Sequence, residues 1–199
     1  MKKHITRIYP RDRGALAALG RCGYVEKSQL GEWWRDKRLS NFEKDGLIQR
    51  ATCSQSASRA DDRTVYRLTT KGRSLCKEVC GLTHLYNPQN PIHDLPLADR
   101  YCALSPAQRE TWQTEGDLLE RFFQKIEYMR DEGDEIAAQI LVREWDEGKI
   151  SMPDCAYKID VVTELAFEVT TNNYGQEEIE AKERAIEILC IEEYEQERA

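Results

Sequence analysis

Charged residues divide this chain into two blocks of opposite sign. Residues 1 to 83 contain 18 Lys and Arg against 9 Asp and Glu, whereas residues 84 to 199 contain 11 against 27. Near the change of sign, residues 83–92 carry two prolines and two asparagines and lack periodicity, so helices break on both sides. The sequence therefore predicts a basic domain (1–82), a linker (83–92) and an acidic domain (93–199), as expected when only one part meets a polyanion.

Composition narrows the class of protein further. With 199 residues, 40% of them hydrophobic, the chain suits one or two small soluble domains. It contains no apolar run near the ~20 residues of a membrane span, and its basic start lacks a following apolar stretch. Seven scattered cysteines do not suggest a disulfide framework and are read as small buried apolar residues. We expect a cytoplasmic protein with no membrane partner.

The basic block predicts three helices, a hairpin and a fourth helix. Apolar spacing favours helices over residues 12–21, with Asp12 as cap, and over 27–34 and 37–45. Two β-rich runs, 47–53 and 64–68, then surround a polar loop rich in small residues, which indicates a hairpin. A last helix is expected from residue 71 to about 80.

Two stretches of this block resemble winged helix-turn-helix proteins. These are residues 43–48, EKDGLI, and 66–72, YRLTTKG. The resemblance implies double-stranded DNA as partner, with the third helix in the major groove and the hairpin wing beside the backbone. Arg38 and Asn41 are expected to read bases, and Arg59 and Arg63 on the wing to hold phosphates. The predicted DNA-binding residues are Lys37, Arg38, Ser40, Asn41, Lys44, Arg59 and Arg63.

The acidic block predicts helices over 93–104, 107–129 and 134–145, strands over 152–159 and 164–170, and a long helix over 176–194 whose glutamate-rich end frays. Pro153-Asp154 and Glu168-Val169 on the two strands resemble the core of PD-(D/E)xK nucleases. In that chemistry Asp and Glu hold a divalent metal and a lysine two residues after the Glu orients the attacking water. Thr170 occupies the lysine position, so the core is read as degenerate and the fold class as α+β.

No catalytic residue and no cofactor are therefore expected. Lys182 on the following helix could in principle reach back, which leaves an alternative site of Asp154, Glu168 and Lys182 with Mg²⁺. A second, weaker alternative is a zinc site, because Cys76, Cys80 and His84 have the spacing of ligands on successive helical turns. Buried cysteines explain that spacing more simply, so no metal is expected.

Over nearly the whole chain the arrangement resembles the replication-relaxation family of mobile genetic elements. The resemblance rests on the winged helix and on four short motifs, His93-Asp94-Leu95, Arg143-Glu144, Pro153-Asp154 and Glu168-Val169. It implies a DNA-binding accessory to plasmid replication or relaxation, with a relaxase or replication protein as partner and the acidic domain used for homodimerisation or partner contact. A metal-dependent endonuclease and a winged-helix transcriptional repressor remain the alternatives.

Overall fold

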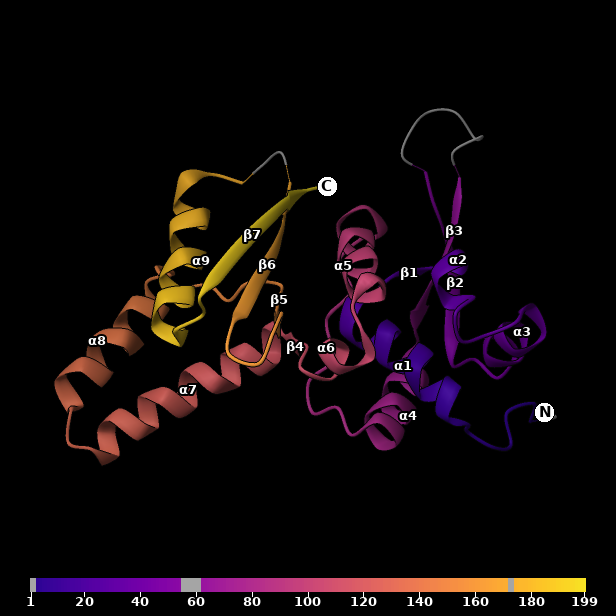
Figure 1. The fold of residues 1–199 in the computed structure, drawn as a ribbon, viewed down its shortest axis with the longest axis horizontal. Helices are drawn as coiled ribbons and strands as arrows, with labels where there is room; N and C mark the ends of the chain where they lie inside the picture. Colours follow the sequence, from indigo (N-terminus) through magenta and orange to yellow (C-terminus); the bar gives the residue numbers. More distant parts are fainter. Residues whose placement is uncertain (1–2, 55–61, 172–173) are drawn as a thin grey trace. The chain divides into compact units, whose positions relative to one another are not determined.

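The computed structural model describes residues 3–54, 62–171 and 174–199 (Figure 1). The chain divides into two compact units, unit 1 (Met1–Leu104) and unit 2 (Ser105–Ala199). Each unit contains both helices and a β-sheet. The α+β fold class is therefore confirmed.

Unit 1 has the predicted order of helices and hairpin, with one short extra strand. Its three-stranded antiparallel sheet has the order β1-β3-β2, and Val25 and Arg50 lie on either side of Tyr66. The predicted order was three helices, a hairpin and a fourth helix, and the strand β1 stands where only an apolar connector was expected. The elements are α1 (Pro10–Cys22), β1 (Val25–Glu26), α2 (Lys27–Leu30), α3 (Asp36–Lys44), β2 (Ile48–Cys53), β3 (Arg63–Leu68), α4 (Thr70–Cys80) and α5 (Pro91–Ala103).

The first two helices differ from their predicted bounds. Helix α1 begins at Pro10, so Asp12 is not the N-cap but the third residue of the helix, and its buried carboxylate accepts from the amide of the N-cap residue Tyr9. Helix α2 ends at Leu30, before Gly31, because glycine is a poor helix former. Trp34, expected inside that helix, is buried beyond its end and stacks on Phe42 with ring centroids 4.1 Å apart. Trp34 thus joins the turn after α2 to α3.

Helix α4 is fixed at its first turn by close packing. The Thr69 hydroxyl accepts a hydrogen bond from the Gly72 amide at 3.1 Å, which caps the helix. A Cβ added at Gly72 would lie 1.8 Å from the Leu47 carbonyl oxygen. Only glycine therefore lets α4 approach the start of the hairpin this closely.

Helix α5 belongs to unit 1, so the compact units meet at residues 104 and 105 and not within the predicted linker. The Asp94 carboxylate accepts from the Tyr24 amide at 3.2 Å, and the Tyr86 amide donates to the Gly20 carbonyl at 2.8 Å. Leu95 packs in a cluster with Tyr24. Burial raises the pKa of Asp94, although hydrogen bonds from His93 and Tyr24 oppose the shift. The His-Asp-Leu motif thus anchors α5 on unit 1.

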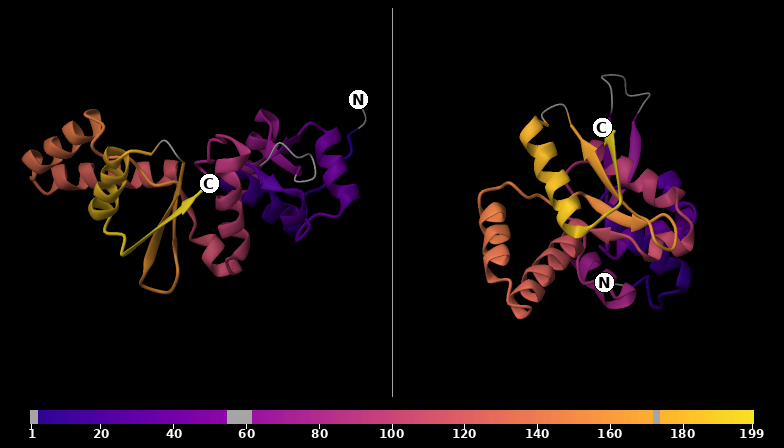
Figure 2. Two further views of the ribbon diagram at one scale, coloured as in Figure 1. Left: turned by 90° about the horizontal axis from the view of Figure 1, so that it is seen from above. Right: turned by 60° about the vertical axis from the view of Figure 1, so that its left-hand side comes forward.

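Unit 2 packs its helices on a four-stranded sheet of order β4-β5-β6-β7, in which β6 and β7 are parallel and the other neighbours antiparallel. One apolar cluster draws residues from α7, α8, α9, β5 and β6. Figure 2 shows the ribbons of these helices beside those of the strands. The helices therefore share one core with the sheet. The elements are α6 (Pro106–Glu110), β4 (Gln113–Thr114), α7 (Glu115–Asp131), α8 (Glu135–Asp146), β5 (Cys155–Lys158), β6 (Glu164–Thr170), α9 (Gln176–Leu189) and β7 (Glu193–Arg198).

The glutamate-rich end is a strand, and the expectation of a frayed helix there is wrong. Helix α9 ends at Leu189 and is followed by Cys190 in the left-handed conformation, with φ of 55°. The chain then pairs β7 in parallel with β6, placing Tyr194 opposite Ala166. The left-handed residue redirects the chain onto the open edge of β6.

No disulfide joins the seven cysteines, all of which lie in the described ranges, and their burial is mixed. Cys22, Cys53, Cys76 and Cys155 are buried as expected, whereas Cys190 is exposed. Among the described residues, every helix is too short or too polar to cross a membrane.

Candidate functional site

Helix α3 is held in place by a buried carboxylate on α1. The Asp12 carboxylate accepts hydrogen bonds from the Trp34 indole at 2.9 Å, the Tyr9 amide at 2.7 Å, and the Arg38 guanidinium at 3.0 and 2.5 Å. Burial opposes ionisation of Asp12, but the hydrogen bonds from Arg38, Tyr9 and Trp34 outweigh it and lower its pKa. The carboxylate therefore stays charged and ties α3 to α1.

This network gives Arg38 a different role from the predicted one. Its guanidinium lies over the rings of Tyr9 and Phe42, at 5.3 and 5.1 Å from their centroids, and also donates to the Arg7 carbonyl. Only 16% of the side chain is exposed. Arg38 is thus directed into unit 1 and not outward beside Asn41, so base reading by Arg38 does not fit the structure.

The other predicted residues of α3 lie nearer the surface. Lys37 and Lys44 are exposed, and Ser40 and Asn41 are half-buried. Arg35, directly before the helix, is also exposed and was not predicted; its place in the basic run with Lys37 was the available signal. Helix α3 therefore presents cationic and amide side chains on the side away from Leu39 and Phe42.

The wing carries the remaining predicted residues. Arg63 begins β3, and its guanidinium lies 3.8 Å from the Glu26 carboxylate with 41% of the side chain exposed. Arg59 lies outside the described residues. On β2, Arg50 hydrogen-bonds the Tyr66 hydroxyl at 3.1 Å and remains largely exposed. Arg50, which follows α3 in the chain, is a further surface cation that sequence reasoning missed.

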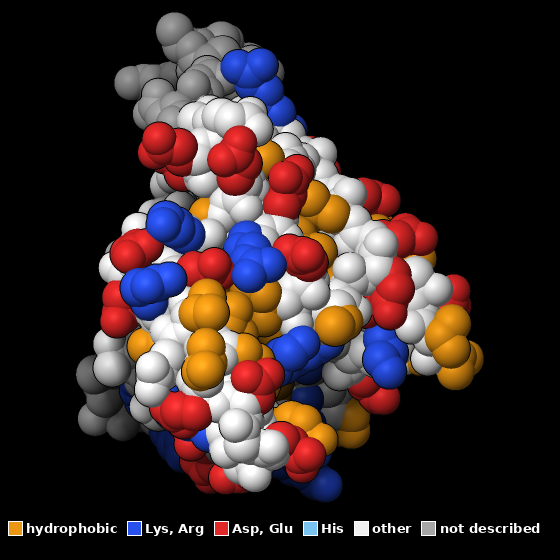
Figure 3. Space-filling model, turned by 90° about the vertical axis from the view of Figure 1, so that its left-hand side faces the viewer, with side chains coloured by type: hydrophobic (Ala, Val, Ile, Leu, Met, Phe, Trp, Pro, Cys, Tyr) orange, Lys and Arg blue, Asp and Glu red, His pale blue; other side chains and the backbone are white. Residues whose placement is uncertain are grey.

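The difference in charge between the units is large. Unit 1 holds 19 Lys and Arg against 11 Asp and Glu, a net charge of +8, and unit 2 holds 10 against 25, a net charge of -15. Figure 3 shows acidic side chains spread among apolar and basic ones over one face of unit 2. A polyanion is thus attracted to unit 1 and repelled by unit 2.

In unit 2 the structure brings together Asp154, Glu168 and Lys182. The Lys182 ammonium lies 3.1 Å from one Glu168 oxygen and donates to the Met152 carbonyl at 2.6 Å. The other Glu168 oxygen accepts from the Asp154 amide at 2.8 Å, and an Asp154 oxygen accepts from the Val169 amide at 2.9 Å. The lysine from α9 therefore does reach back to the strand glutamate.

A tyrosine closes this cluster. The Tyr174 hydroxyl donates to Glu168 at 2.5 Å, and burial followed by the Glu168 contact raises the Tyr174 pKa. Burial also raises the pKa of the nearby Tyr194 to about 12. Both phenols are therefore neutral proton donors at neutral pH and supply no negative charge for a cation.

The cluster does not fit a divalent metal as it is arranged. Both Glu168 oxygens are already occupied, one of them by an ammonium ion that would repel a cation. The cleft beside Lys182, of about 720 Å³, is also lined by Asp146, Glu177 and Glu178, which repel phosphate. In the described ranges, no group of three His, Cys, Asp or Glu is arranged to hold a metal ion.

The weaker zinc alternative is not assembled either. The Cys76 sulfhydryl donates to the Leu16 carbonyl and that of Cys80 to the Arg13 carbonyl. A hydrogen bond with Cys80 and burial raise the pKa of the Cys76 thiol, and the same hydrogen bond lowers that of Cys80. Helix α4 ends at Cys80, so His84 does not continue its helical spacing. These cysteines pack α4 on α1.

Comparisons with known proteins give no family. No protein-family model matches the chain, and no curated protein matches it. Among solved structures, the crystal structure of Bacillus subtilis PadR in complex with operator DNA aligns with 67% of this chain and 80% of that chain. The identity is 15% and the TM-score 0.27, which is too low to establish a common fold.

Proposed function

We propose that unit 1 binds double-stranded DNA sequence-specifically, with α3 in the major groove. The supporting observation is the fixed and polar surface of α3: the Asp12 carboxylate holds the helix, Lys37 and Lys44 are exposed, and Asn41 is half-buried. An amide that reaches base edges, flanked by ammonium groups that reach phosphates, is the chemistry that duplex recognition uses. The charge of +8 on unit 1 favours the same partner.

A titration of full-length variants against a preferred and a scrambled duplex tests this proposal. Asn41→Ala should cost about 1 to 3 kcal/mol of binding free energy on the preferred duplex and reduce the difference in affinity between the two duplexes. Lys37→Ala and Lys44→Ala should weaken binding to both duplexes alike. The slope of log affinity against log salt concentration should fall by roughly 0.9 for each phosphate that the protein no longer neutralises. Lys149→Ala, an exposed lysine of unit 2, is the control with the same change of charge.

The wing is assigned to the phosphate backbone. Arg59→Ala and Arg63→Ala should therefore behave like the lysine variants and leave discrimination intact. If they abolish discrimination while Asn41→Ala preserves it, the wing reads the bases and the docking proposed for α3 is inverted.

On the resemblance to the replication-relaxation family, we assign the bound site to an origin or transfer region of a plasmid or other mobile element. Unit 2 would then contact a relaxase, a replication protein or a second copy. Four large apolar side chains exposed by 39 to 76% support a contact surface there: Phe123 and Tyr128 on α7, Ile136 and Ile140 on α8. Fragments of the parent element selected by the protein would map to an origin, whereas promoter fragments would support a repressor.

The second candidate is a metal-dependent endonuclease, which the approach of Lys182 to Glu168 favours. The occupied Glu168 oxygens and the acidic cleft oppose it. We expect no nicking of supercoiled plasmid with Mg²⁺ or Mn²⁺. Nicking by the wild type that disappears in both Asp154→Ala and Glu168→Ala would establish the nuclease instead.

A further inference from the structure

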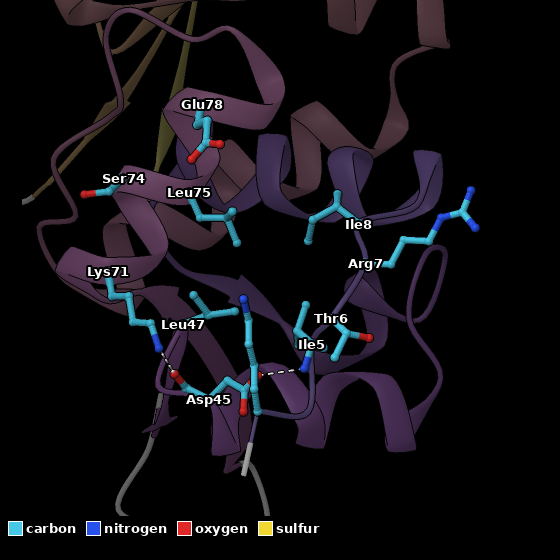
Figure 4. Close-up of a pocket in the computed structure, with 11 residues that line it drawn as sticks. Ile5, Thr6, Arg7, Ile8, Asp45, Leu47, Lys71, Ser74, Leu75 and Glu78 are labelled. Atoms are coloured by element: carbon cyan, nitrogen blue, oxygen red, sulfur yellow. Dashed lines mark hydrogen bonds between the residues drawn. The ribbon is translucent and has the colours of Figure 1, made fainter. Parts of the chain in front are cut away.

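Unit 1 contains a cavity of about 340 Å³ that the DNA-binding proposal does not use. It lies between the N-terminal segment, the turn that follows α3, and α4. Four aliphatic side chains form its walls: Ile5, Ile8, Leu47 and Leu75. Figure 4 shows Leu75 on α4 and Ile8 on the N-terminal segment facing each other across the open space. The volume is at the lower end of the range for small-molecule sites, roughly 300 to 1,000 Å³.

The charges around this cavity favour an anion at one end. Lys3 and Lys71 line it together with Asp45 and Glu78. The Asp45 carboxylate is already bonded to the His4 and Ile5 amides at 2.7 to 3.0 Å, so it is engaged within the protein. Burial opposes ionisation of Asp45, but those amide hydrogen bonds outweigh it and lower its pKa. The Lys71 ammonium donates to the Asp45 carbonyl at 2.7 Å, and an ammonium group has three protons to donate, so it can also serve a ligand.

The same residues connect the cavity to the end of α3. Asp45 is the C-terminal cap of this helix. Its carboxylate holds the N-terminal segment through the His4 and Ile5 amides, and its carbonyl receives Lys71 from α4. A ligand that moves Lys71 or Ile5 must therefore change the contacts that fix the last turn of α3.

We propose that this cavity binds a small amphipathic carboxylate, with its alkyl or aromatic body between Ile8 and Leu75 and its carboxylate at Lys71 and Lys3. We further propose that binding alters the affinity of α3 for DNA. Only this second part rests on the proposed function. Burial of the hydrocarbon supplies the affinity, and the ammonium groups select the charge of the head group.

Calorimetry on the full chain tests the site without DNA. Octanoate is the probe, and 1-octanol and octylammonium are the neutral and cationic comparisons. We expect saturable octanoate binding that exceeds octylammonium binding by about tenfold or more, as one charge-assisted contact allows. Lys71→Met should remove most of that preference. Lys77→Met, an exposed lysine on the same helix, should leave it unchanged.

A cavity-filling variant separates this site from surface adsorption. Leu75→Trp should abolish octanoate binding while circular dichroism shows the wild-type helix content, because the indole occupies the space between Leu75 and Ile8. Leu75→Met, of similar volume, should retain binding and controls for loss of the leucine. Equal octanoate binding by Leu75→Trp and wild type, or tighter binding of octylammonium, would overturn the proposed site.

A DNA titration with and without octanoate tests the coupling. The dissociation constant for DNA should shift by at least threefold in the wild type and not in Leu75→Trp. Saturable octanoate binding with no shift would overturn the coupling and retain the site. If the wild type binds no DNA even without octanoate, the proposed function fails, while calorimetry still decides the cavity.

Discussion

Each unit buries an ion pair between a helix and its neighbour, and the two pairs have opposite consequences. In unit 1 the Arg38 guanidinium meets Asp12 at 2.5 Å, which ties α3 to α1 and leaves the other polar side chains of α3 at the surface. In unit 2 the Lys182 ammonium meets Glu168 at 3.1 Å and occupies a carboxylate that the sequence motif assigns to a metal. The ion pair in unit 1 therefore fixes a helix whose other polar side chains stay at the surface, whereas the ion pair in unit 2 occupies the carboxylate that a metal would need. The role of a charged motif residue depends on its partner.

The largest effect should come from shortening unit 1. A fragment of residues 1–104 should fold alone, whereas residues 1–83 should not. The shorter fragment lacks Tyr86 and the buried Leu95 and Tyr101, and each large apolar side chain contributes about 1.5 to 3 kcal/mol when buried. Circular dichroism during urea titration measures the difference. A cooperative transition in residues 1–83 would show that α5 is dispensable.

Removing the carboxylate of the unit 1 pair should come next. Asp12→Ala leaves Arg38 partly buried without its partner and should lower the free energy of unfolding by about 3 to 5 kcal/mol. Asp36→Ala is the matched control, because its side chain is 84% exposed and its pair with Lys27 should contribute less than about 1 kcal/mol. Urea denaturation of residues 1–104 distinguishes the two. Similar losses of unfolding free energy in the two variants would show that Asp12 does not anchor α3.

Breaking the pair in unit 2 should destabilise that unit and leave DNA binding unchanged. Glu168→Gln keeps the shape but leaves the Lys182 ammonium without a counter-charge, at a cost of about 2 to 3 kcal/mol. The double variant Glu168→Gln, Lys182→Met should recover part of the loss, because no buried charge remains unpaired. Chemical denaturation and DNA titration of the same samples check both statements. Weaker DNA binding by a folded Glu168→Gln protein would show that unit 2 also contributes to DNA binding.

The smallest effect concerns acid pH. Because the folded-state pKa of Asp12 is lowered, its stabilisation is present above its unfolded value near 3.8 and is lost as pH falls through the lowered pKa. Residues 1–104 should therefore lose more of their free energy of unfolding between pH 5 and pH 3 than the Asp12→Asn variant does, by at most about 1 kcal/mol. Urea midpoints at the two pH values give the comparison. Parallel losses in the two proteins would show that Asp12 contributes nothing to the acid transition.

Local signals predicted the hairpin and the strand with residues 164–170 well. Each of these strands is rich in β-branched and apolar residues and is bounded by turn residues, so its own sequence is enough to indicate a strand. The order of elements in unit 1 followed for the same reason. The strand β7 was missed because its glutamate-rich sequence has no apolar alternation, and its pairing with β6 depends on the turn at Cys190. That pairing is a tertiary effect that no local window contains.

The site was predicted less well because its long side chains contact residues that are far away in the sequence. Helical spacing placed Arg38 and Asn41 on one face, but Asp12, 26 residues earlier, draws the guanidinium away. The residues of α5 were wrongly assigned to the acidic domain for a similar reason. The Asp94 carboxylate accepts from the Tyr24 amide, 70 residues earlier in the chain, and this contact holds α5 in unit 1. The return of Lys182 to Glu168 could be proposed from sequence only as an alternative to Thr170, because strand-to-helix reach depends on the turn between them.

The parallel pairing of β6 with β7 also sets an order for folding during synthesis. Unit 1 is complete at Leu104, whereas the sheet of unit 2 needs residues up to Arg198. At about 5 to 20 residues per second, the ribosome takes on the order of 5 to 20 s to supply the intervening chain. A nascent chain therefore carries a finished basic domain while the acidic domain still lacks an edge of its sheet, and unit 1 can meet a polyanion before its acidic neighbour exists in folded form.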